Sequence, residues 1–420
     1  MTSTSIVVVG CGPSAFILSL YLQKYDIPHQ LVISRPLSPG KVGESLLPSI
    51  VTHFRNLNLP TSPLFKNSFV KHGVNFKSSS ASLPLRFDSA GPFYSFNLDR
   101  YDFDKYLLDV YNQRGGKPVF SQSLHLSLSQ SSYSLEVSTV DSTLTFTGLI
   151  IDASGSPSLS SSSIGNHYSS NLKNKATVFW SLVSLNSSNT FQFVDIYLDN
   201  NNSWFWHIPI KSFGDKALSS FGYVSPLANK IPPHYGEFYR KFDLNLIGDF
   251  LNYPTTSSPL HKRDFNYIRK SFFDKNLVLC GDSAAFVDPM MSSGVHYCSF
   301  CAYTLANILR DYHGSPKLHN QLLRYEVLIL LEYLRFHQGV SCLYTENVSV
   351  DNIALLRRFL NLTSAIGEPQ EFDSLLCFEV PDVDLPTIRN KLFKFAFRLL
   401  DSPRVKHLEN ISRIPAFASI

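Results

Sequence analysis

The chain has 420 residues, of which 44% are hydrophobic and 17% are charged, and its formal net charge is +4. This balance is ordinary for a globular enzyme with a large core and excludes a disordered or fibrous chain. Basic residues are scattered among acidic ones, so the charge pattern gives no indication of nucleic-acid binding. No apolar stretch has the length of a membrane span, and no basic flank precedes the first strand, so we expect a cytoplasmic protein.

The N-terminal segment reads as a strand, a glycine-rich turn, a helix and a second strand. Ile6 to Val9 is a short apolar run, Phe16 to Tyr25 has helical spacing, and His29 to Ile33 forms the second strand. The turn between the first strand and the helix has glycine where the chain bends and where the backbone must approach a pyrophosphate. It therefore predicts a dinucleotide site. The turn residues assigned to this site are Gly10, Gly12, Pro13, Ser14 and Ala15.

The end of the second strand departs from the usual pattern of a dinucleotide site. An acidic residue there normally binds the adenosine ribose, but Ser34 and Arg35 occupy the position. Ser34 keeps a hydroxyl for the ribose, and Arg35 faces either the phosphates or solvent. We assign both residues to the cofactor site.

Further along the chain, helical and strand patterns alternate in blocks. Helical spacing is found over 45–57 and 101–112, short alternating strands over 118–150, and a Ser-rich surface loop over 156–163. Four strands between about 175 and 225 predict an antiparallel sheet, and a long helix spans about 293–312. We therefore expect an α/β fold with a nucleotide-binding lobe (1–175, returning at 260–315), an antiparallel-sheet substrate lobe (176–259) and a helical C-terminal region (316–420).

A second glycine motif lies far from the first. Cys280-Gly281-Asp282 ends an apolar strand and leads through a turn into the long helix. This pair of distant motifs resembles glutathione-reductase-like flavoproteins, in which a Gly-Asp holds the ribityl chain of FAD. Arg100 and the turn Asp152 to Gly155 complete a set similar to that of FAD monooxygenases. The resemblance implies an FAD-binding Rossmann lobe. No second dinucleotide motif for a nicotinamide cofactor is visible.

Three motifs narrow the resemblance to flavin-dependent halogenases. Val42 to Pro48 looks like the family's loop over the flavin, and Phe286 to Gly294 is similar to its F-x-x-P-x-x-S-x-G signature. Trp204 to Pro209 matches the family's W-x-W-x-I-P motif in full. Beyond the glycine-rich turn, the expected cofactor contacts are Ser34, Arg35, Gly43, Glu44, Ser45, Arg100, Asp282, Pro289 and Gly294.

The resemblance implies a definite chemistry. Reduced FAD, supplied by a separate flavin reductase, and oxygen convert chloride or bromide into hypohalous acid, which a lysine receives and passes to an aromatic ring. Lys71, within the segment Phe69 to Phe76, resembles that lysine, and a surface lysine is the alternative. Either its ammonium donates a hydrogen bond to hypohalous acid or its neutral amine becomes a haloamine.

Two tryptophans and a helix start complete the expected catalytic site. Trp204 and Trp206 alternate on one strand, so both rings face one side, where they wall the flavin from the substrate; plain core packing is the alternative. The backbone amides of Ser293 and Gly294 begin a helix and are the expected halide site, because a helix N-terminus favours anions. A simple helix cap by Ser292 or Ser293 is compatible with this role.

One departure from the family pattern constrains the substrate. Family members that act on tryptophan carry a glutamate immediately before the serine of S-x-G, and here Met291 occupies that position. We therefore expect the phenol or pyrrole type: an electron-rich, phenolic, polyketide-like aromatic, free or tethered to a carrier protein. His207 and His296 are either bases or structural histidines.

Three alternative functions stay open. An FAD-dependent monooxygenase would hydroxylate the ring directly, and a flavoprotein reductase of isoprenoid double bonds would expose the flavin to lipid. A non-catalytic FAD-binding protein would keep Gly10, Gly12 and Asp282 but would need neither Lys71 nor Trp206.

The six cysteines are too few and too dispersed for a disulfide framework, so we expect free thiols. The Cys298-x-x-Cys301 pair lies within a helical pattern and has no second ligand pair. We interpret it as helix packing and expect no metal.

Overall fold

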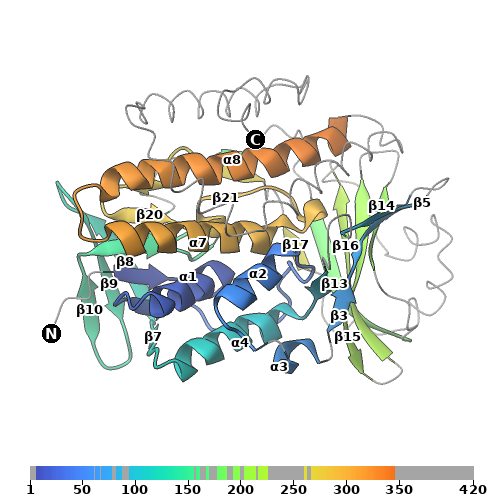
Figure 1. The fold of residues 1–420 in the computed structure, drawn as a ribbon, viewed down its shortest axis with the longest axis horizontal. Helices are drawn as coiled ribbons and strands as arrows, with labels where there is room; N and C mark the ends of the chain where they lie inside the picture. Colours follow the sequence, from blue (N-terminus) through green and yellow to red (C-terminus); the bar gives the residue numbers. More distant parts are fainter. Residues whose placement is uncertain are drawn as a thin grey trace.

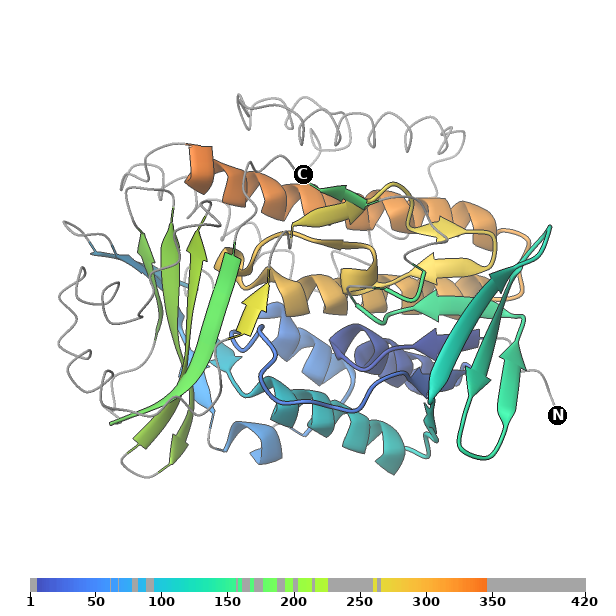
Figure 2. The same cartoon turned by 180° about the vertical axis from the view of Figure 1, so that it is seen from behind.

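The computed structural model describes residues 6–60, 62–66, 68–77, 82–87, 94–155, 158–160, 167–169, 177–186, 193–198, 203–213, 216–225, 260–262 and 266–345. Figures 1 and 2 show helices running side by side between a large sheet at one end and a three-stranded sheet at the other. Among the helices in these ranges, none has the length and hydropathy needed to cross a membrane.

The first lobe is built on a six-stranded sheet in the order β19–β20–β11–β1–β2–β7. Its strands are β1 (Ile6–Val9), β2 (Gln30–Ile33), β7 (Val119–Phe120), β11 (Leu149–Asp152), β19 (Phe273–Asp274) and β20 (Leu277–Leu279). All neighbours pair in parallel except β19 and β20. The central strands are continuous buried Val, Ile and Leu because both faces of the sheet are covered. This is the parallel sheet that the N-terminal pattern predicts.

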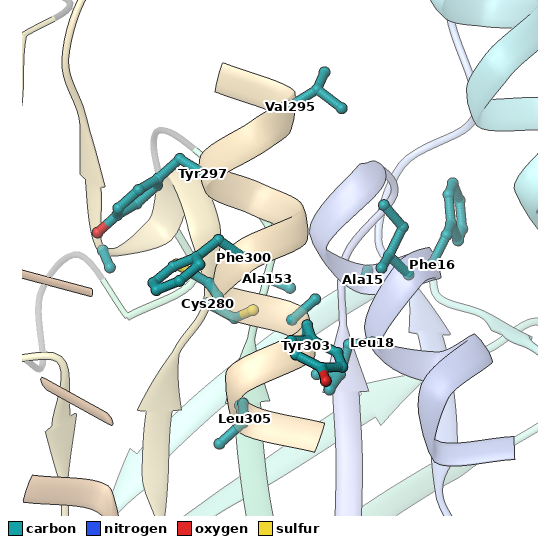
Figure 3. Close-up of a cluster of buried hydrophobic side chains, with 14 of the residues drawn as sticks. Ala15, Phe16, Leu18, Ala153, Cys280, Val295, Tyr297, Phe300, Tyr303 and Leu305 are labelled. Carbon is teal, nitrogen blue, oxygen red and sulfur yellow. The ribbon is translucent and has the colours of Figure 1, made fainter. Parts of the chain in front are cut away.

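Helices pack in successive layers beside this sheet (Figure 1). They are α1 (Pro13–Lys24), α2 (Ser49–Asn56), α3 (Ser62–Phe65), α4 (Arg100–Gln113), α7 (Ser293–Tyr312) and α8 (Leu318–Thr345). Helix α1 is buried along nearly its whole length, since it lies between α4 and α7. Leu18 of α1 and Tyr303 of α7 belong to one cluster of buried side chains (Figure 3), and the rings of Tyr21 and Tyr303 are 5.2 Å apart. This packing places the N-termini of α1 and α7 near each other.

The second large sheet has seven strands in the order β17–β13–β16–β15–β14–β4–β5. They are β4 (Gly73–Lys77), β5 (Ser82–Arg86), β13 (Thr177–Asn186), β14 (Phe193–Leu198), β15 (Trp204–Phe213), β16 (Lys216–Ser225) and β17 (Leu260–Lys262). The four strands predicted between 175 and 225 are present. The sheet is antiparallel except for the parallel pair β14 and β4, which the sequence pattern did not predict.

A short ladder connects the two lobes. Strand β3 (Phe69–Lys71) pairs with β6 (Ser95–Asn97), and Ser45 forms a bridge with Asn97 on the other edge of β6. The remaining elements are β8 (Ser123–Leu128), β9 (Tyr133–Ser138), β10 (Thr143–Phe146), β12 (His167–Ser169), β18 (Tyr267–Arg269), β21 (Ala285–Phe286) and the 3-10 turns η1 (Gly281–Ser283) and η2 (Pro289–Met291).

Two local expectations are wrong. The helix expected over 45–57 begins only at Ser49, because Ser45 is held in the extended ladder beside β6 and Pro48 precedes the first turn. The Ser-rich segment is not wholly at the surface, since Ser160 is fully buried and its hydroxyl donates to Asp152 at 2.5 Å. Helix α8 opens the expected helical C-terminal region, and residues 346–420 lie outside the described ranges. The lobe boundaries stay predictions.

Candidate active site

A cavity of about 590 Å³ lies between the start of α1, the start of α7 and one face of the seven-stranded sheet. Of the residues expected at the site, it is lined by Gly12, Pro13, Ser14, Arg35, Gly43, Glu44, Ser45, Arg100, Trp204, Trp206, Asp282, Pro289 and Gly294. Those that do not line it are Gly10, Ala15, Ser34, Lys71 and Ser293. Segments from both halves of the chain therefore meet at one cavity.

The glycine-rich turn has the close packing and the open backbone that a pyrophosphate site requires. A Cβ atom on Gly10 would lie 2.3 Å from the carbonyl oxygen of Ala153 and 2.9 Å from the Cβ atom of Ala15. A Cβ atom on Gly12 would meet no atom within 4 Å, because this residue faces the cavity at the start of α1. Gly10 and Ala15 thus fix the turn, while Gly12 leaves room for a ligand.

The two distant glycine motifs touch each other. Gly281 has a φ of 65°, and a Cβ atom there would lie 1.9 Å from the hydroxyl oxygen of Ser14. Asp282 follows in the wall of the cavity and accepts a hydrogen bond from the thiol of Cys298 at 3.5 Å. The start of α1 and the Gly-Asp turn therefore form one continuous wall, as two motifs serving one cofactor require.

The end of strand β2 contributes one of its two expected residues. The guanidinium of Arg35 donates to the carbonyl oxygen of Ser154 at 2.8 Å and lines the cavity. Ser34 is half-buried and lies outside the lining, so a ribose contact from its hydroxyl stays a prediction.

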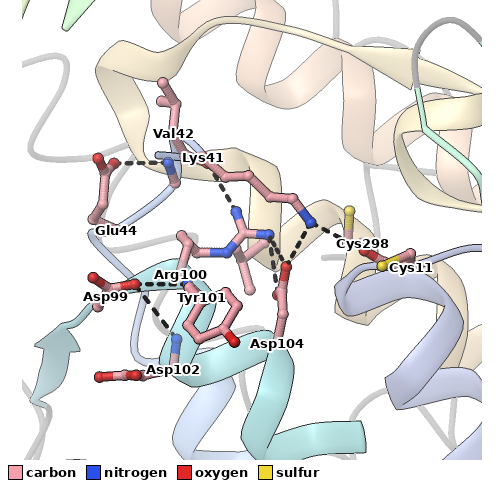
Figure 4. A network of polar contacts seen from close by, with 12 residues as sticks. Cys11, Lys41, Val42, Glu44, Asp99, Arg100, Tyr101, Asp102, Asp104 and Cys298 are labelled. Atoms are coloured by element: carbon pink, nitrogen blue, oxygen red, sulfur yellow. Dashed lines mark hydrogen bonds and ion pairs between the residues drawn. The ribbon is translucent and has the colours of Figure 1, made fainter. Parts of the chain in front are cut away.

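A polar network holds the loop that contains Lys41 and Val42 against the glycine-rich turn (Figure 4). Arg100 donates to the carbonyl oxygen of Val42 at 2.8 Å and to Asp104 at 3.2 Å. Lys41 donates to the same carboxylate and to the carbonyl oxygen of Cys11, each at 3.2 Å. Arg100 therefore positions the loop in addition to lining the cavity. Sequence reasoning missed Lys41, whose signal is its place two residues before Gly43.

A buried carboxyl links this loop to the seven-stranded sheet. Glu44 accepts hydrogen bonds from the backbone amide of Gly43 at 2.8 Å and from the hydroxyl of Ser220 at 2.9 Å. The same hydroxyl accepts the indole N–H of Trp206 at 3.1 Å. Burial raises the pKa of Glu44, against the hydrogen bonds that this carboxyl accepts. The chain of contacts fixes the orientation of the Trp206 ring.

The two tryptophans of β15 form one wall of the cavity. The ring centroids of Trp204 and Trp206 are 5.6 Å apart, and both residues are buried. A Cβ atom on Gly222 of the neighbouring strand would lie 1.9 Å from the Trp206 ring, so only glycine leaves space for that ring. Both tryptophans face the cavity, as their alternation predicts.

Lys71 is completely buried, so the surface-lysine alternative is wrong. Its Nζ atom donates to the carbonyl oxygen of Leu46 at 3.1 Å and to the hydroxyl of Ser292 at 3.4 Å. It also lies 5.2 Å from the centre of the Phe87 ring. Burial lowers the pKa of Lys71 to about 7, and no described carboxylate forms an ion pair with it. Its amine is therefore available in both protonation states near neutral pH.

No side-chain hydrogen bond from the described residues caps the start of α7. Ser292 has a left-handed backbone with φ of 54°, and its side chain makes no capping hydrogen bond. Its hydroxyl donates to Ser45 at 3.2 Å and lines the cavity. The Ser293 hydroxyl points to the carbonyl oxygen of Asp288, and Gly294 lines the cavity. The first turn of a helix leaves backbone amides without intrahelical partners, and of the two residues expected to bind halide only Gly294 lines the cavity.

Neither candidate histidine lines the cavity. His207 lies on the face of β15 opposite Trp206, where it stacks on Phe221 with ring centroids 4.6 Å apart. His296 lies between the Ser49 hydroxyl at 2.6 Å and the Glu332 carboxylate at 2.7 Å. These contacts favour the structural interpretation of both histidines.

The CxxC pair belongs to helix α7, and Cys298 also lines the cavity. Cys298 and Cys301 are both buried, and they are free thiols. Within the described ranges, His, Cys, Asp and Glu form no group that could hold a metal ion.

The residues of the cavity fit FAD. Gly12 and the start of α1 suit the pyrophosphate, the Gly281–Asp282 turn suits the ribityl chain, and the start of α7 suits the isoalloxazine end. The model for the tryptophan halogenase family matches residues 77–352. The chain belongs to this family.

Known halogenases resemble this one along most of their length. The flavin-dependent halogenase armH5 of Armillaria mellea is 26% identical, over 84% of this chain and 73% of its own. The 1H-pyrrole-2-carbonyl-[peptidyl-carrier protein] chlorinase of Pseudomonas fluorescens is 25% identical, over 69% and 72%. The solved structure of halogenase PltM in complex with phloroglucinol and FAD superposes with a TM-score of 0.70 at 16% identity, covering 96% and 93%. The protein is an FAD-dependent halogenase of aromatic substrates, and its cofactors are FAD and halide.

Proposed function

We propose that this halogenase chlorinates or brominates an electron-rich phenol, through hypohalous acid that Lys71 receives. The observation that carries the proposal is the environment of Lys71, which is buried, has its pKa lowered to about 7, and lies one hydroxyl away from the cavity. A separate flavin reductase supplies the reduced cofactor, and the substrate is a small phenolic, polyketide-like ring, free or carried by a partner protein.

Each proposed step is assigned to residues in or next to the wall of the cavity. Bound reduced FAD, with oxygen, supplies the oxidising power that converts halide into hypohalous acid. The backbone amides at Ser293 and Gly294 hold the halide, because the helix start favours an anion. Trp204 and Trp206 fill the sheet side of the cavity and keep an aromatic substrate away from the flavin. This separation favours halogenation over direct hydroxylation by a monooxygenase.

Transfer of the halogen depends on Lys71. As an ammonium it donates a hydrogen bond to hypohalous acid, and as a neutral amine it accepts the halogen and releases water. Ser292 and Leu46 fix the amine for either route. Both routes deliver an electrophilic halogen without exposing the ring to the flavin.

The phenolic substrate class rests on the residue that precedes Ser292 in the sequence. Met291, buried before Ser292, occupies the position of the glutamate found in members that act on tryptophan. A phenol needs less help from a nearby carboxylate, because its own hydroxyl activates the ring. The relatives' substrates support the class, since PltM was solved with phloroglucinol and the Pseudomonas relative acts on a carrier-bound pyrrole.

The test is a reconstituted reaction with purified enzyme, FAD, flavin reductase, NADH, oxygen and chloride or bromide. A panel of phenols is analysed by mass spectrometry, with halide-free controls. We expect halogenated phenol with the wild type and none with Lys71→Ala, while reduced flavin is still oxidised. Lys66→Ala, at an exposed lysine, is the matched control and should retain activity. Hydroxylated product without halogen, or full activity in Lys71→Ala, would refute the proposal.

A further inference from the structure

Lys71 shares one face of the β3–β6 ladder with two other polar side chains. Lys71 pairs with Ser95 and Phe69 pairs with Asn97, so these four side chains leave the ladder on the same side. Ser45, which bridges to Asn97 from the other edge, lies on that side as well. The hydroxyl of Ser292 donates a hydrogen bond to the Ser45 hydroxyl and accepts one from Lys71. This face of the ladder is therefore turned toward the start of α7.

Ser95 and Asn97 each carry one buried polar atom without a hydrogen-bond partner among the described residues. Their exposed fractions are 0% and 1%. The Ser95 hydroxyl and the Asn97 carbonyl oxygen make no hydrogen bond within the part of the chain that the structure describes. Such groups are rare in folded proteins, because each loses its bonds to water without replacement. Two of them beside a reactive lysine indicate a ligand that supplies the missing hydrogen bonds.

The chemistry of the two groups defines that ligand. A side-chain amide oxygen accepts a hydrogen bond, and a serine hydroxyl both accepts and donates one. The Phe87 ring beside Lys71 makes this buried face partly apolar, which disfavours a charged group. A neutral hydroxyl, which donates to Asn97 and exchanges a hydrogen bond with Ser95, satisfies both groups at once.

We propose that Ser95 and Asn97 are specificity-determining residues that bind the phenolic hydroxyl of the substrate next to Lys71. This inference rests on the proposed function and deepens it, because it identifies the group by which the enzyme recognises its ring. A hydroxyl held on this face brings the ring carbons that it activates toward the lysine. A ring that lacks the hydroxyl leaves both protein groups unpaired and is rejected.

The experiment measures binding by calorimetry to the FAD-loaded, oxidised enzyme. The probes are phloroglucinol, the other phenols of the panel and the methyl ether of each. The variants are Ser95→Ala and Asn97→Leu, and the control is Ser19→Ala, whose hydroxyl is likewise buried and unpartnered but lies in α1. We expect each ladder variant to weaken phenol binding by about tenfold, while FAD affinity and methyl-ether binding stay unchanged.

A stability measurement separates recognition from a structural role. Because the Ser95 and Ser19 hydroxyls make no hydrogen bond within the described ranges, Ser95→Ala and Ser19→Ala should melt at or above the wild-type temperature, and only Ser95→Ala should lose phenol affinity. If Asn97→Leu does not fold, Ser95→Ala carries the test.

Three outcomes would overturn the inference. Phenol binding that is unchanged in the ladder variants refutes it while leaving phenol halogenation intact. Unchanged phenol binding together with less halogenated product per reduced FAD assigns the two groups to hypohalous acid instead. A wild-type enzyme that binds no phenol of the panel refutes this inference and the proposed function together.

Discussion

The Nζ atom of Lys71 lies 3.4 Å from the hydroxyl of Ser292, which joins a buried amine to the wall of the FAD cavity. Lys71 itself does not line the cavity. The same serine hydroxyl donates to Ser45, so segments from three parts of the chain meet at this point. On the route proposed above, a small neutral molecule formed in the cavity would pass the Ser292 hydroxyl to reach the amine.

Replacing Lys71 by methionine should stabilise the protein most at low pH. Burial lowers the pKa of Lys71 to about 7, whereas a lysine in the unfolded chain titrates near 10.4. Between these values the unfolded state binds more protons, so wild-type stability rises with pH; below about 7 the full cost of burying the ammonium is present. Melting temperatures of Lys71→Met and wild type should differ most below pH 7 and approach each other above it. A difference that is constant with pH would contradict the lowered pKa.

Substituting Gly222 by alanine should move the Trp206 ring, because the new Cβ atom would lie 1.9 Å from it. We expect FAD affinity to fall by about tenfold and more reduced flavin to be oxidised without halogenated product, since the wall of the cavity is displaced. Flavin fluorescence titration and a peroxide assay measure the two effects. Ser219→Ala changes the opposite face of the same strand and should leave FAD affinity as in the wild type. If both variants had the same FAD affinity and released the same amount of peroxide, the Trp206 ring would not be needed as a wall of the cavity.

Removing the charge of Lys41 should weaken the cofactor complex. Its ammonium lies 3.2 Å from the carbonyl oxygen of Cys11, in the turn that suits the pyrophosphate. We expect Lys41→Gln to raise the FAD dissociation constant by about fivefold at low salt and by less at high salt, because Lys41 is partly exposed and salt screens the attraction between its charge and the phosphates. Lys105→Gln removes an exposed charge from helix α4 and should have no effect. An equal loss at both salt concentrations would show that Lys41 acts through packing.

Neutralising Glu332 should destabilise the contact between α7 and α8. Its carboxylate accepts from His296 at 2.7 Å and from Arg335 at 2.5 Å. Burial by itself would raise the pKa of Glu332, but Arg335 and the His296 hydrogen bond outweigh it and hold the pKa below its ordinary value. Glu332→Gln leaves Arg335 without its partner and should cost about 3 kcal/mol near neutral pH.

The stabilisation that Glu332 contributes depends on pH. A carboxyl with a lowered pKa stabilises the fold above its unfolded value, and the contribution is lost as pH falls through the folded value. Wild type and Glu332→Gln should therefore converge in acid when unfolding is followed by circular dichroism. Asp311→Asn, in the exposed pair with Arg310, is the control and should change stability by less than about 0.5 kcal/mol. A gap between the curves that widens in acid would contradict the lowered pKa.

The sequence by itself determined the features that depend on neighbouring residues. The turn at Gly10 to Ala15 is legible because glycine spacing, a preceding apolar strand and a following helix are contiguous. The alternation of Trp204 and Trp206 likewise places both rings on one face of β15 without reference to the rest of the fold. The cofactor, the parallel sheet and the family could be predicted on this local basis.

Only the tertiary structure decided which side chains lose contact with water and which distant groups meet. The sequence singles out Lys71 only by its resemblance to the family's lysine and leaves a surface position open; its lowered pKa arises from burial, with Leu46, Phe87 and Ser292 around the amine. The Glu44–Ser220–Trp206 chain and the unpaired groups of Ser95 and Asn97 depend on strand register. These contacts depend on which distant strands pair and in which register, because a one-residue shift would turn every side chain of a strand to the other face.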